Sequence, residues 1–239
     1  MAQTERNNLA IYDDVADRWW SDDIRWVRTL KNMVPARLSG FDKSIDWHDN
    51  KGLDLGCAGG FMAEAIHDRG AKVTGIDPAA DAIKAAEAHA AATSRDIAYD
   101  VGVGENLPYD DASFDAVVCV DVLEHVSDLA KVTQEIARVL KPGGILLFDT
   151  INRNPIARFV TITVAENILR ILPKGTHDPA MFIKPSELRE QLQKAGLEPG
   201  KTVGMGPRGI NRRGDFVFGK LPGTFVIFMG TARKSGVLS

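Results

Sequence analysis

Short apolar runs alternate with helical segments along the middle of the chain. Apolar residues are concentrated in five segments that we expect to be strands: Gly52–Leu55, Ala71–Ile76, Ile97–Val101, Phe114–Val120 and Ile145–Asp149. The segments between them have helical spacing and composition: Phe61–Asp68, 79–92 and Leu129–Leu140. This alternation predicts an α/β fold with a doubly wound, parallel sheet. Because ligands bind beyond the carboxyl ends of such strands, we expect the ligand-binding residues just after each strand.

The sequence on either side of this core follows a different pattern. Residues 9–39 read as helical, with Trp19 and Trp20 among the apolar points, and end near Pro35 and Gly40. The two tryptophans either cover a ligand or anchor this helix to the core. We expect one domain over 1–239. Along the chain it consists of a helical cover at 1–45, a ligand-binding core at 50–150, a lid-like insertion at 152–184 and a final part at 185–239. The final part contains a last helix, Pro185–Lys194, and two strands, near Lys201–Met205 and Phe225–Ala232.

The insertion contains an imperfect amphipathic helix between Pro155 and Pro173. On a helical wheel the apolar residues share one broad arc, and Glu166, Asn167 and Arg170 lie on the other. The apolar arc consists of Val160, Val164, Ala165, Ile168, Leu169, Ile171 and Leu172. Such a helix is a lid over an apolar substrate, a helix lying on a membrane surface, or an ordinary cover of the domain, and we favour packing as a lid.

The charge and the cysteine content limit the partners and the cellular location that we expect for the protein. The 29 Lys+Arg residues nearly balance the 32 Asp+Glu residues, so the net charge of −3 predicts no nucleic-acid partner. No uncharged apolar stretch reaches the roughly 18 residues that a membrane-spanning helix needs. Cys57 and Cys119 are too few for a disulfide scaffold, and the polar N-terminus lacks a secretory signal. We therefore expect a cytoplasmic protein, with peripheral membrane contact through 155–173.

A glycine loop and two acidic residues predict an adenosine cofactor. The first strand runs into Gly56-Cys57-Ala58-Gly59-Gly60, where small residues let the backbone approach a ligand. Asp77 ends the second strand, where a carboxylate can accept both ribose hydroxyl groups. Asp54 stands beside the loop, where it disfavours the pyrophosphate of NAD and suits an ammonium group. The cofactor that fits is S-adenosylmethionine, although both aspartates could simply cap the backbone.

The order of these motifs resembles that of the class I S-adenosylmethionine-dependent methyltransferases. Gly104 and Glu105 follow the third strand, where their backbone groups can meet an adenine edge, and Asp121 ends the fourth. Over residues 50–150 the ordered set is similar to that family. The resemblance implies a Rossmann-like sheet of seven strands in the order 3-2-1-4-5-7-6, with strand 7 antiparallel.

A narrower resemblance is to the ubiquinone-biosynthesis O-methyltransferases. It rests on segments inside and outside the core: Ala16–Trp20, Pro35–Leu38, Asp121–Val126, Ile151–Asn154, Pro173–Asp178 and Phe182–Leu188. The resemblance implies cofactor contacts at Arg37, Gly56, Asp77 and Val120, and a phenolic or quinol acceptor. It also links the region after residue 152 with prenyl-quinol access and membrane contact.

The same resemblance implies a site for a divalent ion at Asp121, Glu124 and His125. If the chain turns helically there, the three residues share one face, and their donors suit Mg²⁺, Mn²⁺ or Zn²⁺. Such an ion could lower the pKa of a catechol oxygen. The alternative remains open, because a Leu-Glu-His sequence after the fourth strand also occurs in methyltransferases without a metal, and Asp121 is shorter than the family's glutamate.

The expected activity is O-methyl transfer from S-adenosylmethionine to a phenolic or catecholic hydroxyl. His177, beside Asp178, is a candidate base, and His125 and Glu124 are the other acceptor-side candidates. The sequence after Gly200 follows the quinone family only loosely. Three alternatives therefore stay open: an O- or N-methyltransferase of another small metabolite, a catalytically silent cofactor-binding protein, and an NAD-dependent dehydrogenase.

Overall fold

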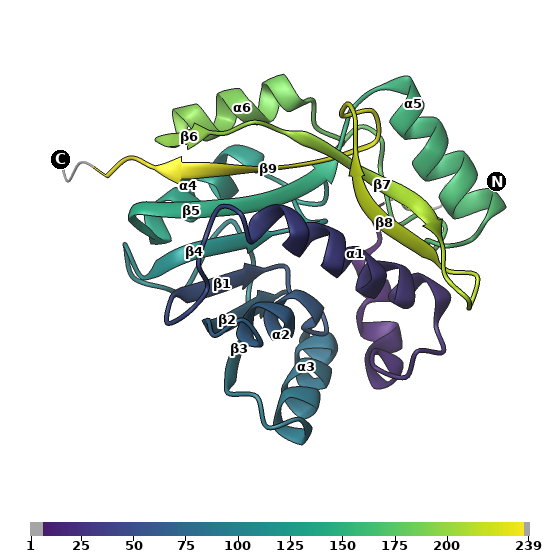
Figure 1. Ribbon diagram of the computed structural model, residues 1–239, viewed down its shortest axis with the longest axis horizontal. Helices are drawn as coiled ribbons and strands as arrows, with labels where there is room; N and C mark the ends of the chain where they lie inside the picture. Colours follow the sequence, from purple (N-terminus) through teal and green to yellow (C-terminus); the bar gives the residue numbers. More distant parts are fainter. Residues whose placement is uncertain (1–6, 237–239) are drawn as a thin grey trace.

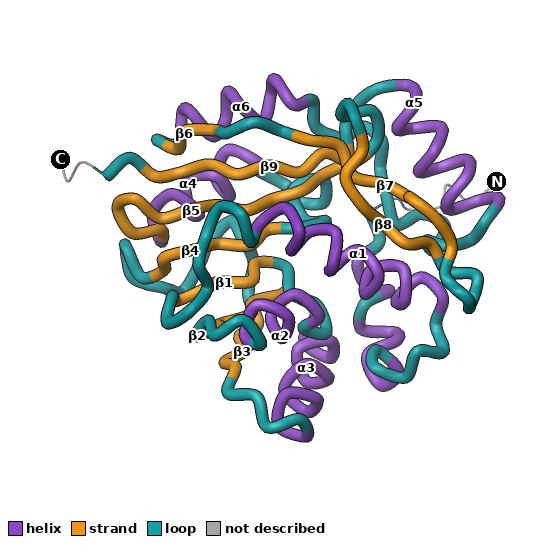
Figure 2. The backbone as a smooth tube through the Cα atoms, viewed as in Figure 1, coloured by secondary structure: helices purple, strands orange, loops and turns teal. Residues whose placement is uncertain are grey.

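A mixed β-sheet runs through the molecule, which is described over residues 7–236 by a computed structural model. Its strands lie in the order β3-β2-β1-β4-β5-β9-β7-β8, and β6 pairs with β9. The strands are β1 (Lys51–Leu55), β2 (Lys72–Asp77), β3 (Ile97–Val101), β4 (Phe114–Cys119), β5 (Leu140–Ile151), β6 (Leu197–Pro199), β7 (Val203–Ile210), β8 (Phe216–Leu221) and β9 (Ile227–Lys234). Figure 2 shows the strands in orange between helices in purple.

The predicted sheet topology is confirmed, with two additions at its end. Strands β1 to β5 pair in parallel, and β9 is antiparallel to both β5 and β7. The sequence predicted two final strands, whereas the structure also contains the short β6 and a hairpin partner, β8. A turn closes that hairpin, in which Asn211 N donates to Asp215 O at 2.9 Å and Gly214 has a φ of +81°. Arg28 then holds the hairpin to the first long helix through both oxygens of Asp215.

Helices cover the two faces of the sheet and divide the core into two layers. The helices are α1 (Arg25–Phe41), α2 (Phe61–His67), α3 (Ala80–Ala92), α4 (Leu129–Val139), α5 (Pro155–Arg158) and α6 (Pro185–Lys194). Helices α1, α2 and α3 pack on one face, and α4 and α6 pack on the other. Side chains of β4 alternate accordingly: Val118 joins the first layer, and Val117 and Cys119 join the second.

The N-terminal segment is not the single helix that the sequence predicted over 9–39. It forms two 3-10 turns, η1 (Leu9–Ile11) and η2 (Asp13–Arg18), and α1 begins only at Arg25. Trp19 turns inward between them, with its ring centroid 5.2 Å from that of Phe61. The chain therefore changes direction between η2 and α1, with the buried Trp19 at this bend. In Figure 1 the purple segment lies at the carboxyl end of the parallel strands.

The insertion after β5 is a short helix that widens into a π-helix. Helix α5 continues into η3 (Phe159–Ile168), and Leu169 N donates to Val164 O at 2.8 Å, an i→i+5 bond. A π-helix has more residues in each turn than an α-helix, so a wheel drawn with α-helical spacing places its side chains wrongly. Glu166, predicted on the polar arc, is in fact 2% exposed, and Ile168, predicted on the apolar arc, is 64% exposed.

Candidate active site

A cavity of about 650 Å³ opens at the carboxyl ends of β1, β2 and β4. Seven of the predicted cofactor residues line it: Arg37, Asp54, Gly56, Asp77, Gly104, Glu105 and Val120. Gly60 does not line the cavity; it precedes α2 with a φ of +91°, and a Cβ there would lie 2.6 Å from the Tyr99 hydroxyl. Seven of the eight residues predicted to bind a cofactor therefore line one cavity, and Gly60 lies in the loop that precedes α2.

The glycine loop is held in an unusual conformation by Asp77. Gly56 has a φ of +76°, and a Cβ there would lie 2.1 Å from Val122 Cγ2. Ala58 also has a positive φ, +44°. The carboxylate of Asp77 accepts hydrogen bonds from Ala58 N at 2.9 Å and Ala79 N at 2.8 Å. Asp77 thus connects the loop to the end of β2 and also faces the cavity. Its carboxylate therefore caps backbone N–H groups and is also placed to contact a ligand.

Asp54 carries a buried carboxylate whose oxygens accept no hydrogen bond from the described residues. The residue is 1% exposed, and neither carboxylate oxygen has a hydrogen-bond partner among the described residues. Burial raises the pKa of Asp54 to about 7, and the nearby Ala63 N–H, which does not reach hydrogen-bonding geometry, opposes this only in part. A cation entering the cavity would restore the partner that this carboxylate lacks. The sequence predicted that Asp54 faces an ammonium group, and a buried carboxylate without a partner suits such a cation.

Arg37 lies between two aspartates at the inner wall of the cavity. Its Nε donates to Asp149 Oδ2 at 2.6 Å, and its Nη2 forms an ion pair with Asp121. Asp149 also accepts from Asp121 N at 2.9 Å. Arg37 is 3% exposed, and the carboxylates of Asp121 and Asp149 balance the positive charge of its guanidinium inside the fold. Arg37 lines the cavity as expected, and its side-chain hydrogen bonds and ion pairs are with the two carboxylates.

The structure does not support the predicted divalent-ion site at Asp121, Glu124 and His125. Asp121 has a φ of +55°, so the chain does not turn as the α-helix that would align the three residues. Each side chain also has its own partner: Asp121 pairs with Arg37, Glu124 accepts from Thr150, and His125 contacts Asn7. Over residues 7–236, no group of three His, Cys, Asp or Glu residues is arranged to hold a metal ion.

Glu124 instead belongs to the interior behind the cavity. Burial, and then the charge of Asp121, raise the pKa of this carboxyl above its usual range. Its Oε2 accepts from the Thr150 hydroxyl at 2.7 Å, while Oε1 has no partner among the described residues. Glu124 lines neither this cavity nor its neighbour, so the structure gives it no direct path to an acceptor.

A second, smaller cavity of about 190 Å³ adjoins the first and is lined mainly by apolar side chains. Four residues line both cavities and define their junction: Tyr12, Leu30, Asp121 and His125. The insertion supplies one wall of the second cavity, and the β7–β8 hairpin supplies another; these contribute Val160, Ala165, Ile171, Leu172, Met205, Phe218 and Leu221. The adjoining cavities can therefore hold a polar cofactor beside an apolar ligand.

Two histidines face each other where the cavities meet. The ring centroids of His125 and His177 are 5.1 Å apart. Burial, and then the neighbouring His177, lower the pKa of His125 to about 3, so this ring is neutral. Asn7 Nδ2 donates to the His125 carbonyl, which leaves Asn7 Oδ1 to accept from His125 Nδ1–H at 2.6 Å. The predicted partner of His177, Asp178, is replaced by Glu166, whose Oε1 lies 3.0 Å from His177 Nδ1.

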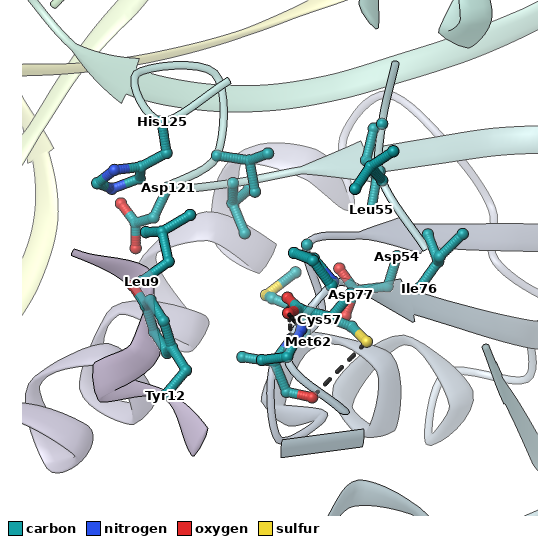
Figure 3. A pocket seen from close by; sticks show the side chains of 18 of the residues that line it. Leu9, Tyr12, Asp54, Leu55, Cys57, Met62, Ile76, Asp77, Asp121 and His125 are labelled. Carbon is teal, nitrogen blue, oxygen red and sulfur yellow. Dashed lines mark hydrogen bonds between the residues drawn. The ribbon is translucent and has the colours of Figure 1, made fainter. Parts of the chain in front are cut away.

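The sequence predicted Arg37 at the site and left open that Trp19 covers a ligand, but it did not indicate the contribution of Leu9 and Tyr12. Leu9, Tyr12 and Trp19 line the first cavity, and Figure 3 shows Leu9 and Tyr12 across this cavity from Asp54 and Asp77. Burial raises the pKa of the Tyr12 phenol far above its usual range, as do the nearby carboxylates of Asp121 and Asp77. Trp20 acts as an anchor, since its Nε1 donates to Gly59 O at 3.0 Å. Only the paired tryptophans signalled this role in the sequence.

Comparison with known proteins identifies the family. A methyltransferase domain model matches residues 53–148. A ubiquinone biosynthesis O-methyltransferase of Paracidovorax citrulli is 42% identical, covering 89% of this chain and 90% of the relative. The Thiobacillus denitrificans protein of that name is 38% identical, with 86% and 88% covered.

The fold likeness extends to more distant structures. An S-adenosylmethionine-dependent methyltransferase from Thermotoga maritima superposes with a TM-score of 0.68 at 20% identity, covering 95% of this chain and all of that one, which shows the shared fold. The curated relatives, far closer in sequence, identify the chain more narrowly. This chain is therefore an S-adenosylmethionine-dependent methyltransferase that belongs to the ubiquinone biosynthesis O-methyltransferase family.

Proposed function

We propose that the protein methylates a phenolic or catecholic hydroxyl of a polyprenyl quinol precursor in ubiquinone biosynthesis. The observation that carries this proposal is the apolar second cavity that adjoins the cofactor cavity. An acceptor with a polar ring and an apolar tail would place its hydroxyl at the junction and its tail against the insertion. The names of the curated relatives support the same class of acceptor.

The residues of the cofactor cavity would hold S-adenosylmethionine by complementary charge and shape. Asp54 would pair with the ammonium group, Asp77 would meet the ribose, and the backbone around Gly104 and Glu105 would meet the adenine. When bound, the cofactor supplies an electrophilic methyl group, which passes to the acceptor oxygen while the electron pair of the broken bond stays on sulfur. The protein's contribution is alignment of the two partners and removal of the hydroxyl proton.

His177 is the residue that we propose as the base. It lines the acceptor cavity, and the carboxylate beside its Nδ1 stabilises the ring once it has gained a proton. His125 stands at the junction, and its low pKa makes it a poor base but a good neutral hydrogen-bond partner for the acceptor. Because the three predicted ligands do not converge, no step here is assigned to a metal ion.

The test is transfer of a labelled methyl group to a series of catechols. We expect product with catechols that carry short prenyl chains, and a lower KM as the chain lengthens to fill the apolar cavity. A matched series of amines serves as the comparison. Methylation of amines in preference to every phenol, or cofactor binding without transfer to any phenol, would overturn the proposal.

We further propose that residues 155–173 contact a membrane surface, from which an apolar acceptor would enter. Exposed apolar side chains gather there, including Ile156, Phe159 and Ile168 at 54%, 57% and 64% exposure. The exposed Arg158 and Arg170 lie in the same segment and would favour anionic headgroups. No helix among residues 7–236 is long and apolar enough to cross a membrane.

A further inference from the structure

Glu166 has an orientation that its position in the sequence does not suggest. The π-helix η3 turns its side chain inward, where it is 2% exposed in a segment whose neighbours at 167–170 are exposed. A buried carboxylate costs free energy unless donors surround it. The donors that surround the Glu166 carboxylate must therefore offset the cost of its burial.

Three donors from one loop converge on this carboxylate. Gly175 N donates to Oε2 at 3.0 Å, and His177 N donates to Oε1 at 3.1 Å. His177 Nδ1 lies 3.0 Å from the same Oε1. Because an ionised carboxylate can only accept, the proton in this last bond belongs to His177 Nδ1. Glu166 thus selects the tautomer whose Nε2 is the basic nitrogen.

We propose that Glu166 is a positioning residue, which holds His177 in the tautomer and orientation that accept a proton from the acceptor hydroxyl. This inference rests on the proposed function, with His177 as the base. The proton moves from the acceptor oxygen to Nε2 of His177, the carboxylate balances the positive charge that forms on the ring, and the proton then leaves to solvent. Glu166 itself touches neither the acceptor nor the cofactor cavity.

The neighbours of His177 define how this arrangement responds to pH. Glu166 faces it from η3, His125 from the loop after β4, and Asp178 follows it in the chain. Asp121 and Tyr12 line the same cavity. Asp121 is paired with Arg37 and His125 is neutral, and among residues 7–236 the carboxylate of Glu166 contacts the His177 ring directly.

The direct test is the kinetics of Glu166→Gln as a function of pH. The amide keeps the shape but cannot stabilise a charged imidazole, so we expect kcat to fall about 10-fold to 100-fold. The acid limb of the kcat profile should move to lower pH, because a ring without its carboxylate takes up a proton less readily. The exposed Glu87→Gln is the matched control and should leave both quantities unchanged. Cofactor affinity should be unchanged in both variants.

A loss of kcat without movement of the acid limb would show that Glu166 only braces the loop, and would overturn the proposal. Nitrogen-15 spectra of the His177 ring in the wild-type protein provide a reading that needs neither turnover nor a folded variant. We expect the Nδ1–H tautomer, and an Nε2–H tautomer would contradict the inference. If wild-type protein shows this tautomer but transfers no methyl group to phenols, the proposed function fails while the pairing of Glu166 with His177 stands.

Discussion

The carboxylate of Asp77 accepts a hydrogen bond from the backbone N–H of Ala58, a glycine-loop residue with a positive φ. This bond and the second one to Ala79 mean that the residue facing the cofactor cavity also fixes the shape of its wall. Changes at Asp77 therefore affect the site in two ways, through the contact itself and through the backbone that the contact organises.

Asp77→Asn should reduce the affinity for S-adenosylmethionine at least about 10-fold. The amide can accept only through its single oxygen, so one of the two backbone donors loses its partner, and a charged-group hydrogen bond is worth roughly 1.5–3 kcal/mol. Isothermal titration calorimetry measures the change. Asp110→Asn, at an exposed aspartate, is the control. Equal affinity in the two variants would show that Asp77 does not organise the site.

Asp54→Asn should stabilise the ligand-free protein above neutral pH while weakening cofactor binding. Because burial raises the folded-state pKa of Asp54 to about 7, stability falls as pH rises from its unfolded pKa near 4 through 7. The full effect is on the order of 4 kcal/mol. Chemical unfolding of both proteins between pH 4 and 8 isolates the contribution of this residue. Parallel stability profiles would contradict the assignment.

Tyr12→Ala should raise the KM for the acceptor about 10-fold or more, because removal of a large aromatic side chain merges the two cavities. Tyr12 stands at their junction, and its ring packs edge-on against Trp26 at 5.7 Å. Tyr12→Phe preserves these ring contacts and is the control for wall shape. Initial-rate kinetics with a prenylated catechol distinguish the variants. An unchanged KM in Tyr12→Ala would place the acceptor elsewhere.

Phe159→Asp combined with Ile168→Asp should weaken binding to anionic vesicles about 10-fold or more. Each side chain that enters the lipid interface contributes roughly 1.5–3 kcal/mol of apolar transfer free energy. Co-sedimentation with vesicles of phosphatidylglycerol and phosphatidylcholine gives the measurement. Val101→Asp alters an equally exposed apolar residue at the opposite edge of the sheet and should have no effect. Equal binding by all three proteins would refute surface contact through this segment.

The grouping of Asp54, Gly56 and Asp77 around one cavity was predictable because its signals are local in the sequence. Asp54, Gly56 and Asp77 each stand at the end of a strand, and the strand pattern alone brings those ends to one edge of the sheet. The second cavity was not predictable in this way. Its walls come from segments joined only by tertiary packing, including the β7–β8 hairpin, whose pairing the apolar pattern did not indicate.

Two errors have the same physical origin, an assumed α-helical period. A wheel with α-helical spacing placed Glu166 in solvent, but the wider π-helical turn rotates it into the interior. Likewise, a helical turn would have gathered Asp121, Glu124 and His125, but the left-handed backbone of Asp121 separates their directions. In both places backbone geometry, which single-residue propensities do not encode, decided which side chains meet.

The N-terminal segment has a consequence for the time that a ligand remains bound. Asp13 accepts from Asp81 N at 2.8 Å at the start of α3, and Trp20 holds Gly59 from the other side. These two attachments span the wall that Leu9 and Tyr12 form over the cavity. We therefore expect the exchange of spent cofactor for fresh cofactor to require that both attachments open, so that a short stretch of chain outside the Rossmann core limits the rate of turnover.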